Sequence, residues 1–168
     1  MDKKVVCLLI LSSVGMDAST QCSFVAQFGD FQYCFIDQIL NWNSAVETCS
    51  DMGWSLAVPY SADEHSFIWN MFTGAVQSRN VWIGCSKCQV SGKWVQPGGK
   101  ECHYANWAPG EPSGQYCLQM WRARGGLLDD TFCDHWHFVI CKRSRGKLRS
   151  AQMTRCVQAD ASGRFAFK

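Results

Sequence analysis

Charged residues are scarce in this chain. Asp, Glu, Lys and Arg make up 18% of its 168 residues, whereas hydrophobic residues make up 47%. This composition excludes a disordered polyelectrolyte. The formal net charge of +2 gives no general argument for binding nucleic acid, so no nucleic-acid partner is expected. The length suits one domain with a sizeable core and is too short for two.

The motifs of common enzyme classes are also absent. The chain has no G-x-S-x-G nucleophile elbow, no H-E-x-x-H helix and no glycine-rich phosphate loop. Asp129 and Asp130 are adjacent carboxylates, but no positioned acid or base accompanies them in the sequence. Metal ligation therefore explains them better than catalysis, and a non-catalytic protein is predicted.

Cysteine and tryptophan, by contrast, are abundant, with 11 and 8 residues respectively. Cysteine at this density fits an oxidising compartment, because small domains there supplement a limited core with crosslinks. The composition therefore indicates an extracellular protein with structural disulfides.

The amino terminus supports secretion. Two lysines precede the apolar run 5–11, and small residues follow with a cut site after Ala18, which predicts a signal peptide over residues 1–18. The run falls well short of the roughly 20 residues that a membrane-spanning helix needs, so an uncleaved anchor is the weaker alternative. No membrane span is expected after cleavage. Cleavage would remove Cys7 and leave an even number of cysteines, which can all pair.

Charge divides the chain near its carboxyl end. Residues 1–141 carry 8 Lys or Arg against 13 Asp or Glu, whereas residues 142–168 carry 8 Lys or Arg against a single Asp. We therefore place a folded domain at residues 22–143 and a basic C-terminal extension at residues 144–168. The cations from Lys142 onward could attract anionic glycans or cell surfaces, although a solvated end is the simpler interpretation.

Local patterns predict two helices and several strands in the domain. Short apolar or alternating runs predict strands at 31–35, 81–83, around Trp94 and at 138–141. Capping boxes at 44–47 and 61–64 predict helices that end at Gly53 and Gly74. The stretch 97–130, rich in turn residues, is a long irregular loop, and such loops are usually functional.

Five ordered segments carry a resemblance to a known family. They are the helical half from Trp42 to Ile68, the strand 82–85 (WIGC), the loop segment 106–113 (NWAPGEPS), the segment 126–133 (GLLDDTFC) and the closing strand 138–141 (FVIC). In this order and spacing they resemble a long-form C-type lectin-like domain. The resemblance implies an α+β fold in which two helices pack on antiparallel β-sheets and a long irregular loop binds the ligand.

The resemblance also implies three disulfides, which join Cys22 with Cys34, Cys49 with Cys141 and Cys117 with Cys133. Four cysteines remain, with three ways to pair them: Cys85, Cys88, Cys102 and Cys156. We favour a bond between Cys85 and Cys102, which leaves Cys156 to bond Cys88 or a second chain, as in a disulfide-linked oligomer. The C-x-x-C spacing at 85–88 is also typical of redox and zinc sites, but a four-cysteine zinc site needs a second such pair and the sequence has none.

Sugar-binding members of the family hold one Ca²⁺ on the long loop, where the ion coordinates two vicinal hydroxyls of a monosaccharide. Calcium takes about 6–8 oxygen ligands in flexible geometry, so sugar oxygens can complete its shell. Position by position, the resemblance assigns the metal and ligand site to Glu111, Ser113, Gln115, Asp129 and Asp130. Three of these residues differ from the family: Ser113 replaces an Asn, Gln115 replaces a Glu and Asp129 replaces an Asn. The resemblance also implies a cis peptide bond before Pro112. The predicted function is calcium-dependent recognition of a glycan or glycoprotein.

Two departures from the family favour the alternative, a calcium-independent module that binds a protein on the same scaffold. Only residues 114–116 separate Ser113 from Cys117, which is a shorter spacer than in typical sugar binders. Leu128 also replaces a buried Trp beneath the loop. In this alternative the metal site has been lost while the fold has been kept.

Two further groups of side chains lie near the loop in the sequence. The rings of Tyr116, Trp121 and Trp136 could stack on a sugar, although tryptophans more often belong to a core. His135 and His137 have a spacing that could bind zinc from one face of a strand, but a solvated pair on an edge is the better interpretation.

Overall fold

The structure is a computed structural model that describes residues 22–146. The predicted signal peptide, Cys156 and the extension beyond Gly146 lie outside the described residues. In chain order, the elements are β1 (Phe24–Phe28), β2 (Phe31–Leu40), α1 (Trp42–Asp51), β3 (Ser55–Leu56), α2 (Ala62–Ala75), β4 (Val81–Lys87), β5 (Trp94–Val95), β6 (Cys117–Trp121), the 3₁₀ turn η2 (Arg122–Arg124), β7 (Leu127–Thr131) and β8 (His137–Ser144). Over this described range, neither helix has the length and hydrophobicity that crossing a membrane demands.

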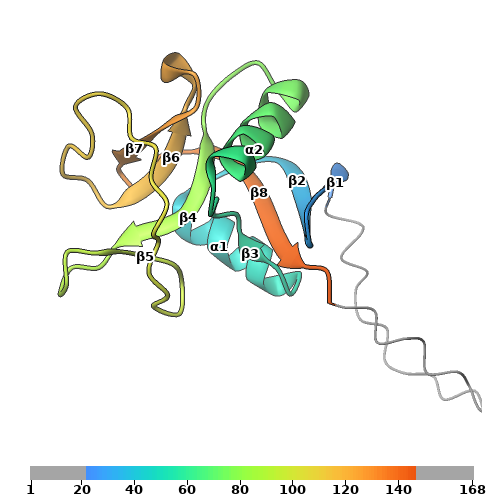
Figure 1. Cartoon of the computed structure of the whole chain (residues 1–168), viewed down its shortest axis with the longest axis horizontal. Coiled ribbons are helices and arrows are strands. Elements are labelled where there is room, and N and C mark those ends of the chain that lie inside the picture. Colours follow the sequence, from blue (N-terminus) through green and yellow to red (C-terminus); the bar gives the residue numbers. More distant parts are fainter. Residues whose placement is uncertain (1–21, 147–168) are drawn as a thin grey trace, which may run out of the picture.

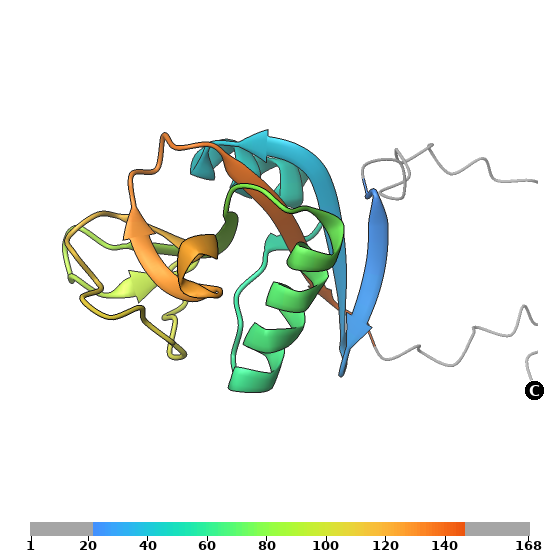
Figure 2. The ribbon, with the colours of Figure 1, turned by 90° about the horizontal axis from the view of Figure 1, so that it is seen from above.

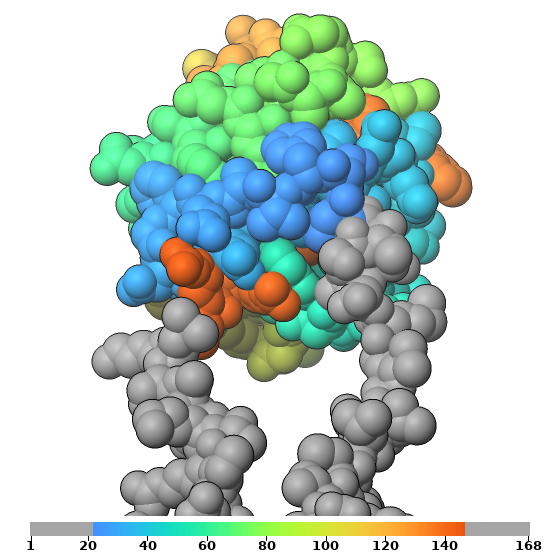
Figure 3. All heavy atoms as spheres, turned by 90° about the vertical axis from the view of Figure 1, so that its right-hand side faces the viewer, coloured from blue at the N-terminus to red at the C-terminus, as the bar shows by residue number. Residues whose placement is uncertain are grey.

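One mixed sheet joins strands from both ends of the domain. Its order is β1-β2-β8-β4-β6-β7, with β3 paired to β8 and β5 to β4. The pairings among these strands are antiparallel except that of β4 with β8, which meet in parallel at Val81 and Phe138. Figure 1 shows β1 and β2 at one end of the molecule and β6, β7 and the long loop at the other. Figure 3 shows β1 and the end of β8 on one face. The predicted α+β class is confirmed.

The sheet has an apolar core on each face, because successive side chains of a strand point to opposite sides. On one face, Tyr33 and Ile83 pack in the same cluster as Phe72 of α2. On the other face, Trp82 packs in a cluster with Trp42 of α1. Figure 2 shows the two helices on either side of the central strands. The helices therefore cover the middle of the sheet and leave β6 and β7 to carry the long loop.

Four disulfides join elements that are distant in the chain. They link Cys22 with Cys34, Cys49 with Cys141, Cys85 with Cys102 and Cys117 with Cys133. These are the three pairs that the resemblance implies and the pair favoured among the remaining cysteines. The bond between α1 and β8 spans 92 residues, a separation for which chain-entropy arguments give about 4–5 kcal/mol.

A side-chain cap begins each helix. Asn41 caps α1, because its Oδ1 accepts a hydrogen bond from the backbone N–H of Ser44 at 2.9 Å. The prediction that α1 begins with Ser44 is therefore wrong, since Asn41 offers an earlier acceptor to the first turn. Ser61 caps α2 as predicted, accepting from Glu64 N–H at 3.1 Å. This helix continues one residue past Gly74.

The first cation of the basic run lies inside the fold. Lys142 is 7% exposed, and its ammonium pairs with Glu64 and donates to the carbonyl of Val58 at 3.2 Å. The Tyr33 hydroxyl donates to the same Glu64 carboxylate. Burial raises the pKa of Tyr33, and this hydrogen bond raises it further. The interpretation of Lys142 as part of a solvated end is therefore wrong, because this residue ties β8 to the start of α2.

The substitution Lys142→Met should destabilise the domain by about 3–5 kcal/mol, because it leaves the Glu64 carboxylate buried without a cation. The double variant Lys142→Met with Glu64→Gln removes both charges and should recover much of the loss. Denaturant unfolding followed by tryptophan fluorescence measures both changes. A single variant as stable as the natural chain would show that this ion pair does not hold the two elements together.

Candidate metal centre

The long loop is anchored to β7 through its backbone. Ala108 N–H donates to the carbonyl of Leu128, and Leu128 N–H donates to the carbonyl of Asn106, both at 2.8 Å. Leu128 is 1% exposed, so it fills the position beneath the loop. Trp107 packs on Trp94, with ring centroids 5.4 Å apart. The loop therefore stays on β7 although leucine stands where the family has a tryptophan.

Three carboxylates converge where the loop meets β7. Oxygen atoms of Glu111, Asp129 and Asp130 all lie within 4.8 Å of one another. Glu111 comes from the loop, and its peptide bond to Pro112 is cis, as the resemblance implies. Asp129 and Asp130 are consecutive residues of β7. The structure thus brings together three of the five predicted ligands, and we call these three residues the carboxylate triad.

Asp130 holds the turn that follows Pro112. Its Oδ1 accepts from the Ser113 backbone N–H at 2.5 Å, and its Oδ2 accepts from Gly114 N–H at 2.8 Å. Burial alone would raise the pKa of this carboxyl group, but the backbone N–H donors outweigh it and the pKa lies below its usual range. Asp130 is therefore a fixed anion, 2% exposed, at the base of the turn.

Glu111 is the least satisfied member of the triad. Its Oε2 is buried and has no hydrogen-bond partner among the described residues. Burial raises the pKa of Glu111, and the neighbouring carboxyls of Asp130 and Asp129 raise it further, against a lowering hydrogen bond from Ser113. No cationic side chain of residues 22–146 forms an ion pair with the triad. A bound cation would relieve both the repulsion and the missing partner.

Asp129 is oriented by a chain of amides that the sequence interpretation missed. Gln119 Nε2 donates to Asp129 Oδ2 at 2.5 Å, and Asn80 Nδ2 donates to Gln119 Oε1 at 2.6 Å. The backbone N–H of Arg122 in turn donates to Asn80 Oδ1 at 2.8 Å. The one signal of this chain in the sequence is Gln119, a polar residue among the apolar residues of strand β6. In the structure Gln119 is only 4% exposed.

The two neutral residues of the predicted site lie at its outer edge. The Ser113 hydroxyl donates to Gln115 Oε1 at 2.6 Å, so the amide oxygen expected to ligate an ion accepts from the serine. The short spacer 114–116 thus folds Gln115 back onto the turn. The five predicted residues form one connected cluster, in which the triad supplies the anionic oxygens.

This donor set fits calcium. Ca²⁺ prefers carboxylate and amide oxygens in a flexible shell of about 6–8 ligands. The triad offers several carboxylate oxygens on rigid backbone, including the orphaned Oε2 of Glu111, and leaves room in such a shell for oxygens of a ligand. Zinc, which favours nitrogen and sulfur, finds neither in this cluster.

Several aromatic side chains lie near the carboxylate triad in the sequence, and they differ in how much of each ring is exposed. Tyr116 and Trp136 are 49% and 53% exposed. Phe132, which the sequence interpretation did not single out, is 57% exposed. Trp121 is partly buried, and the guanidinium of Arg124 lies over it, 5.3 Å from the ring centroid. Tyr116 and Trp136 are therefore available to stack on a ligand, whereas Trp121 is partly covered.

The prediction that His135 and His137 are both exposed to solvent is wrong for His137. His137 is 8% exposed, its ring centroid lies 4.4 Å from that of Trp82, and neither ring nitrogen has a hydrogen-bond partner among the described residues. Strand β8 begins at this residue, which places its side chain against the core. His135 is exposed, and its Nδ1 lies 2.8 Å from Thr131 Oγ1. Burial, with help from the neighbouring His135, lowers the pKa of His137 to about 4.

The C-x-x-C spacing does not form a redox or zinc pair, because Cys85 is bonded to Cys102. Among the described cysteines, Cys88 is the one without a disulfide. Its predicted partner Cys156 lies outside the described residues, so a bond between them, or to a second chain, stays a prediction.

Known proteins share this sequence pattern. The model of the family described as Lectin C-type domain matches residues 38–143. C-type lectin 16 of Aedes aegypti is 31% identical over 147 residues, which cover 82% of this chain and 90% of that protein. The similarity thus extends over most of both chains.

Solved structures share the fold. C-type lectin CEL-I from Cucumaria echinata has a TM-score of 0.66 at 24% identity and covers 73% of this chain and 96% of its own. A calcium-independent type II antifreeze protein has a TM-score of 0.63 at 27% identity, with 73% and 92% covered. The same scaffold therefore occurs both in a protein named as a lectin and in one described as calcium-independent.

Calcium should raise the melting temperature of the chain. At about a hundredfold excess over its Kd, a bound ion adds about 2.7 kcal/mol to the free energy of unfolding. The substitution Glu111→Gln removes one anionic ligand and should abolish most of this rise, whereas Asp63→Asn on the exposed side of α2 should keep it. Scanning calorimetry in chelator and in millimolar calcium makes the comparison. Equal melting temperatures in the two conditions would contradict a calcium site.

The burial of His137 should make stability depend on pH. In the unfolded chain its pKa is 6.5, whereas the folded pKa is about 4, so only the unfolded state gains a proton between these values. Its contribution to stability is complete above pH 6.5 and is lost as the pH falls towards 4. His137→Phe keeps a ring against Trp82 and should flatten this part of the stability curve. The exposed His103→Phe serves as the control, and equal slopes for the two variants in denaturant titrations would show that His137 is not buried in its neutral form.

Proposed function

Because the chain belongs to the C-type lectin domain family, we propose that it binds a glycan or glycoprotein through Ca²⁺ held at the carboxylate triad. Ser113 and Gln115 complete the site at its outer edge. The family is non-catalytic, so the chain is a binding protein rather than an enzyme. The observation that carries the proposal is the convergence of three carboxylates within 4.8 Å, without a cationic partner among residues 22–146.

When bound, the ion supplies coordination positions for two neighbouring hydroxyls of a sugar. The chain itself pre-positions the ligands: backbone N–H groups fix Asp130, and Gln119 fixes Asp129. Carboxylates held in this way lose little conformational freedom on binding, which favours affinity. The Ser113 hydroxyl and the Gln115 amide can then hydrogen-bond the same sugar hydroxyls.

We also propose that the protein is secreted. Residues 1–18 would act as the signal peptide, residues 22–143 as the binding domain and residues 144–168 as a basic extension. The four disulfides support an oxidising compartment, because thiols are kept reduced in the cytosol.

A calcium-independent binding module is the second candidate, and one observation favours it. Both oxygens of Asp130 already accept hydrogen bonds from the turn, so the turn is held without an ion. The antifreeze protein with 27% identity is described as calcium-independent. In this case the exposed rings of Tyr116 and Trp136 would contact a protein partner.

The chain should be retained on an immobilised sugar in calcium and released by chelator. A glycan array probed with and without calcium identifies the sugar for the column. Asp129→Ala should weaken sugar binding by about tenfold or more, because it removes a ligand oxygen of the ion, whereas the exposed Asp134→Ala should bind normally. Retention that survives chelator would favour the calcium-independent module.

A further inference from the structure

A hollow lies between the hairpin that joins β4 to β5 and the turn that Asp130 holds. Its volume is about 430 Å³, which falls in the range of about 300–1,000 Å³ found for small-molecule sites. Figure 1 shows the end of β4, where this hairpin begins, beside the start of β6. Six residues line the space, which we call the hairpin–turn hollow: Lys87, Cys88, Gln89, Gly92, Gly114 and Tyr116.

The hairpin–turn hollow and the carboxylate triad share one turn of the chain. Gly114 lines the hollow, and its N–H donates to Asp130 Oδ2 at 2.8 Å. Glycine at this position, with a φ of 119°, carries no side chain that could separate the two spaces. The N–H of Lys87 donates to the carbonyl of Tyr116 at 2.8 Å and ties the same turn to β4. A ligand held at the triad can therefore extend into the hollow.

The strand pattern places Lys87 on the same face of the sheet as Asp130. Lys87 follows Cys85 by two residues along β4, so both side chains point to one face. Cys85 packs in the same core cluster as Leu118, whose partner on β7 is Asp130. The long loop covers this face, since Cys85 is bonded to Cys102 of the loop. The cation of β4 and the buried carboxylate of the triad therefore project from one side of the sheet.

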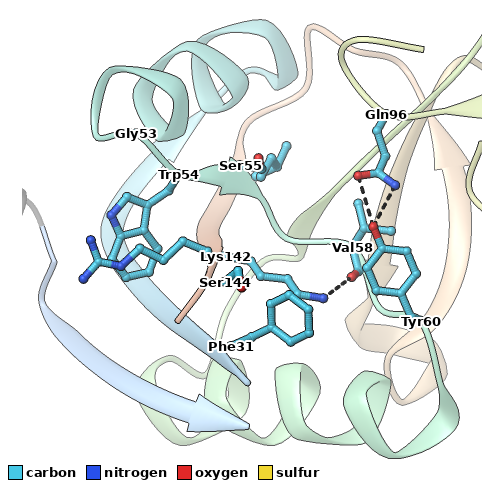
Figure 4. A pocket seen from close by; sticks show the side chains of 11 residues that line it. Phe31, Gly53, Trp54, Ser55, Val58, Tyr60, Gln96, Lys142 and Ser144 are labelled. Carbon is cyan, nitrogen blue, oxygen red and sulfur yellow. Dashed lines mark hydrogen bonds between the residues drawn. The ribbon is translucent and has the colours of Figure 1, made fainter. Parts of the chain in front are cut away.

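Lys87 is a cation without a partner. Its ammonium forms no hydrogen bond and no ion pair with the residues that the structure describes. Lys93 of the same hairpin, by contrast, pairs with Glu101 at 3.0 Å. Lys142, which lines a separate hollow at the end of β8, donates to the carbonyl of Val58, as Figure 4 shows. The ammonium of Lys87 is therefore free to bind an anionic group.

Tyr116 and Gln89 complete the walls. The Tyr116 ring is 49% exposed, and an aromatic face suits the apolar C–H face of a sugar ring. The amide of the exposed Gln89 offers donors and an acceptor to sugar hydroxyls. Ring, amide and ammonium line one space, so together they suit a sugar unit with an anionic substituent.

We propose that the hairpin–turn hollow is a second subsite, which holds the sugar unit next to the one on the ion and favours a unit that bears a sulfate or a carboxylate. Lys87 pairs with the anionic substituent, because its compact ammonium with three N–H donors recognises an anion by charge. Tyr116 stacks on the ring of this unit. The proposal rests on the function proposed for the carboxylate triad and narrows its ligand to an acidic glycan.

A glycan array probed with the full disulfide-bonded chain, in calcium and in chelator, tests this preference. Lactose, cellobiose and mannobiose are each compared with forms that bear a 6-sulfate or a 6-carboxylate on the reducing unit. In calcium, at least one anionic form should bind about tenfold more tightly than its neutral parent, because hydrogen bonds to charged groups are the stronger ones.

The two proposals fail in different ways on this array. Calcium-dependent binding with equal affinity for neutral and anionic forms overturns the second subsite alone. If no glycan on the array binds in a calcium-dependent manner, both the metal-dependent function and the subsite are overturned.

Matched lysine variants locate the anion. Lys87→Gln should weaken binding of the anionic forms by about tenfold, while the neutral parents and the calcium-induced rise in melting temperature stay unchanged. Lys93→Gln removes a cation of the same hairpin outside the lining and should keep the preference. Circular dichroism confirms that each variant is folded. A preference that survives in Lys87→Gln, or a loss that extends to the neutral parents, overturns the role of Lys87.

A second pair of variants tests the apolar wall. Tyr116→Leu should weaken binding of the disaccharides and leave galactose, glucose and mannose unchanged, because a monosaccharide occupies the ion site alone. Trp136→Leu removes a similarly exposed ring outside the lining and should leave the gain of the second unit intact. Equal losses for monosaccharides and disaccharides in Tyr116→Leu would contradict the place of this ring in the second subsite.

Discussion

The hydrogen bonds of Asp130 are the contacts on which the long loop and the proposed metal site depend. They run from β7 to the backbone of Ser113 and Gly114, and so fix a turn that has no regular structure of its own. Strand β7 is in turn paired with β6 along its whole length, and the disulfide from Cys117 to Cys133 closes the same region. The loop thereby shares the rigidity of the sheet, which a site with fixed geometry requires.

The fold separates two regions of opposite charge. The carboxylate triad gathers negative charge on β7 and the loop, whereas the end of β8 gathers cations beside aromatic rings. The buried pair of Glu64 and Lys142 ties this second region to α2 and leaves Arg143 as the free cation of the strand.

Much of the fold could be predicted from the sequence, because its signals are local. The cap at Ser61 depends on residues within one helical turn, and the structure confirms it. The start of α1 differs from the one that the capping box predicts, because Asn41 competes with Ser44 as the cap of the first turn. The burial of Lys142 depends on the position of β8 between β2 and β4, which no local pattern reveals. The triad residues lie in the segments that carry the family resemblance. The contact between Asn80 and Gln119 spans 39 residues, and only the fold brings the two together.

The most direct measurement is a crystal structure of the disulfide-bonded chain grown with calcium and a glycan that it retains. We predict one ion whose distances to carboxylate oxygens of Glu111, Asp129 and Asp130 are about 2.3–2.6 Å, with sugar hydroxyls in its remaining positions. A triad without an ion at millimolar calcium, or a glycan seated away from it, would contradict the proposed metal-dependent recognition.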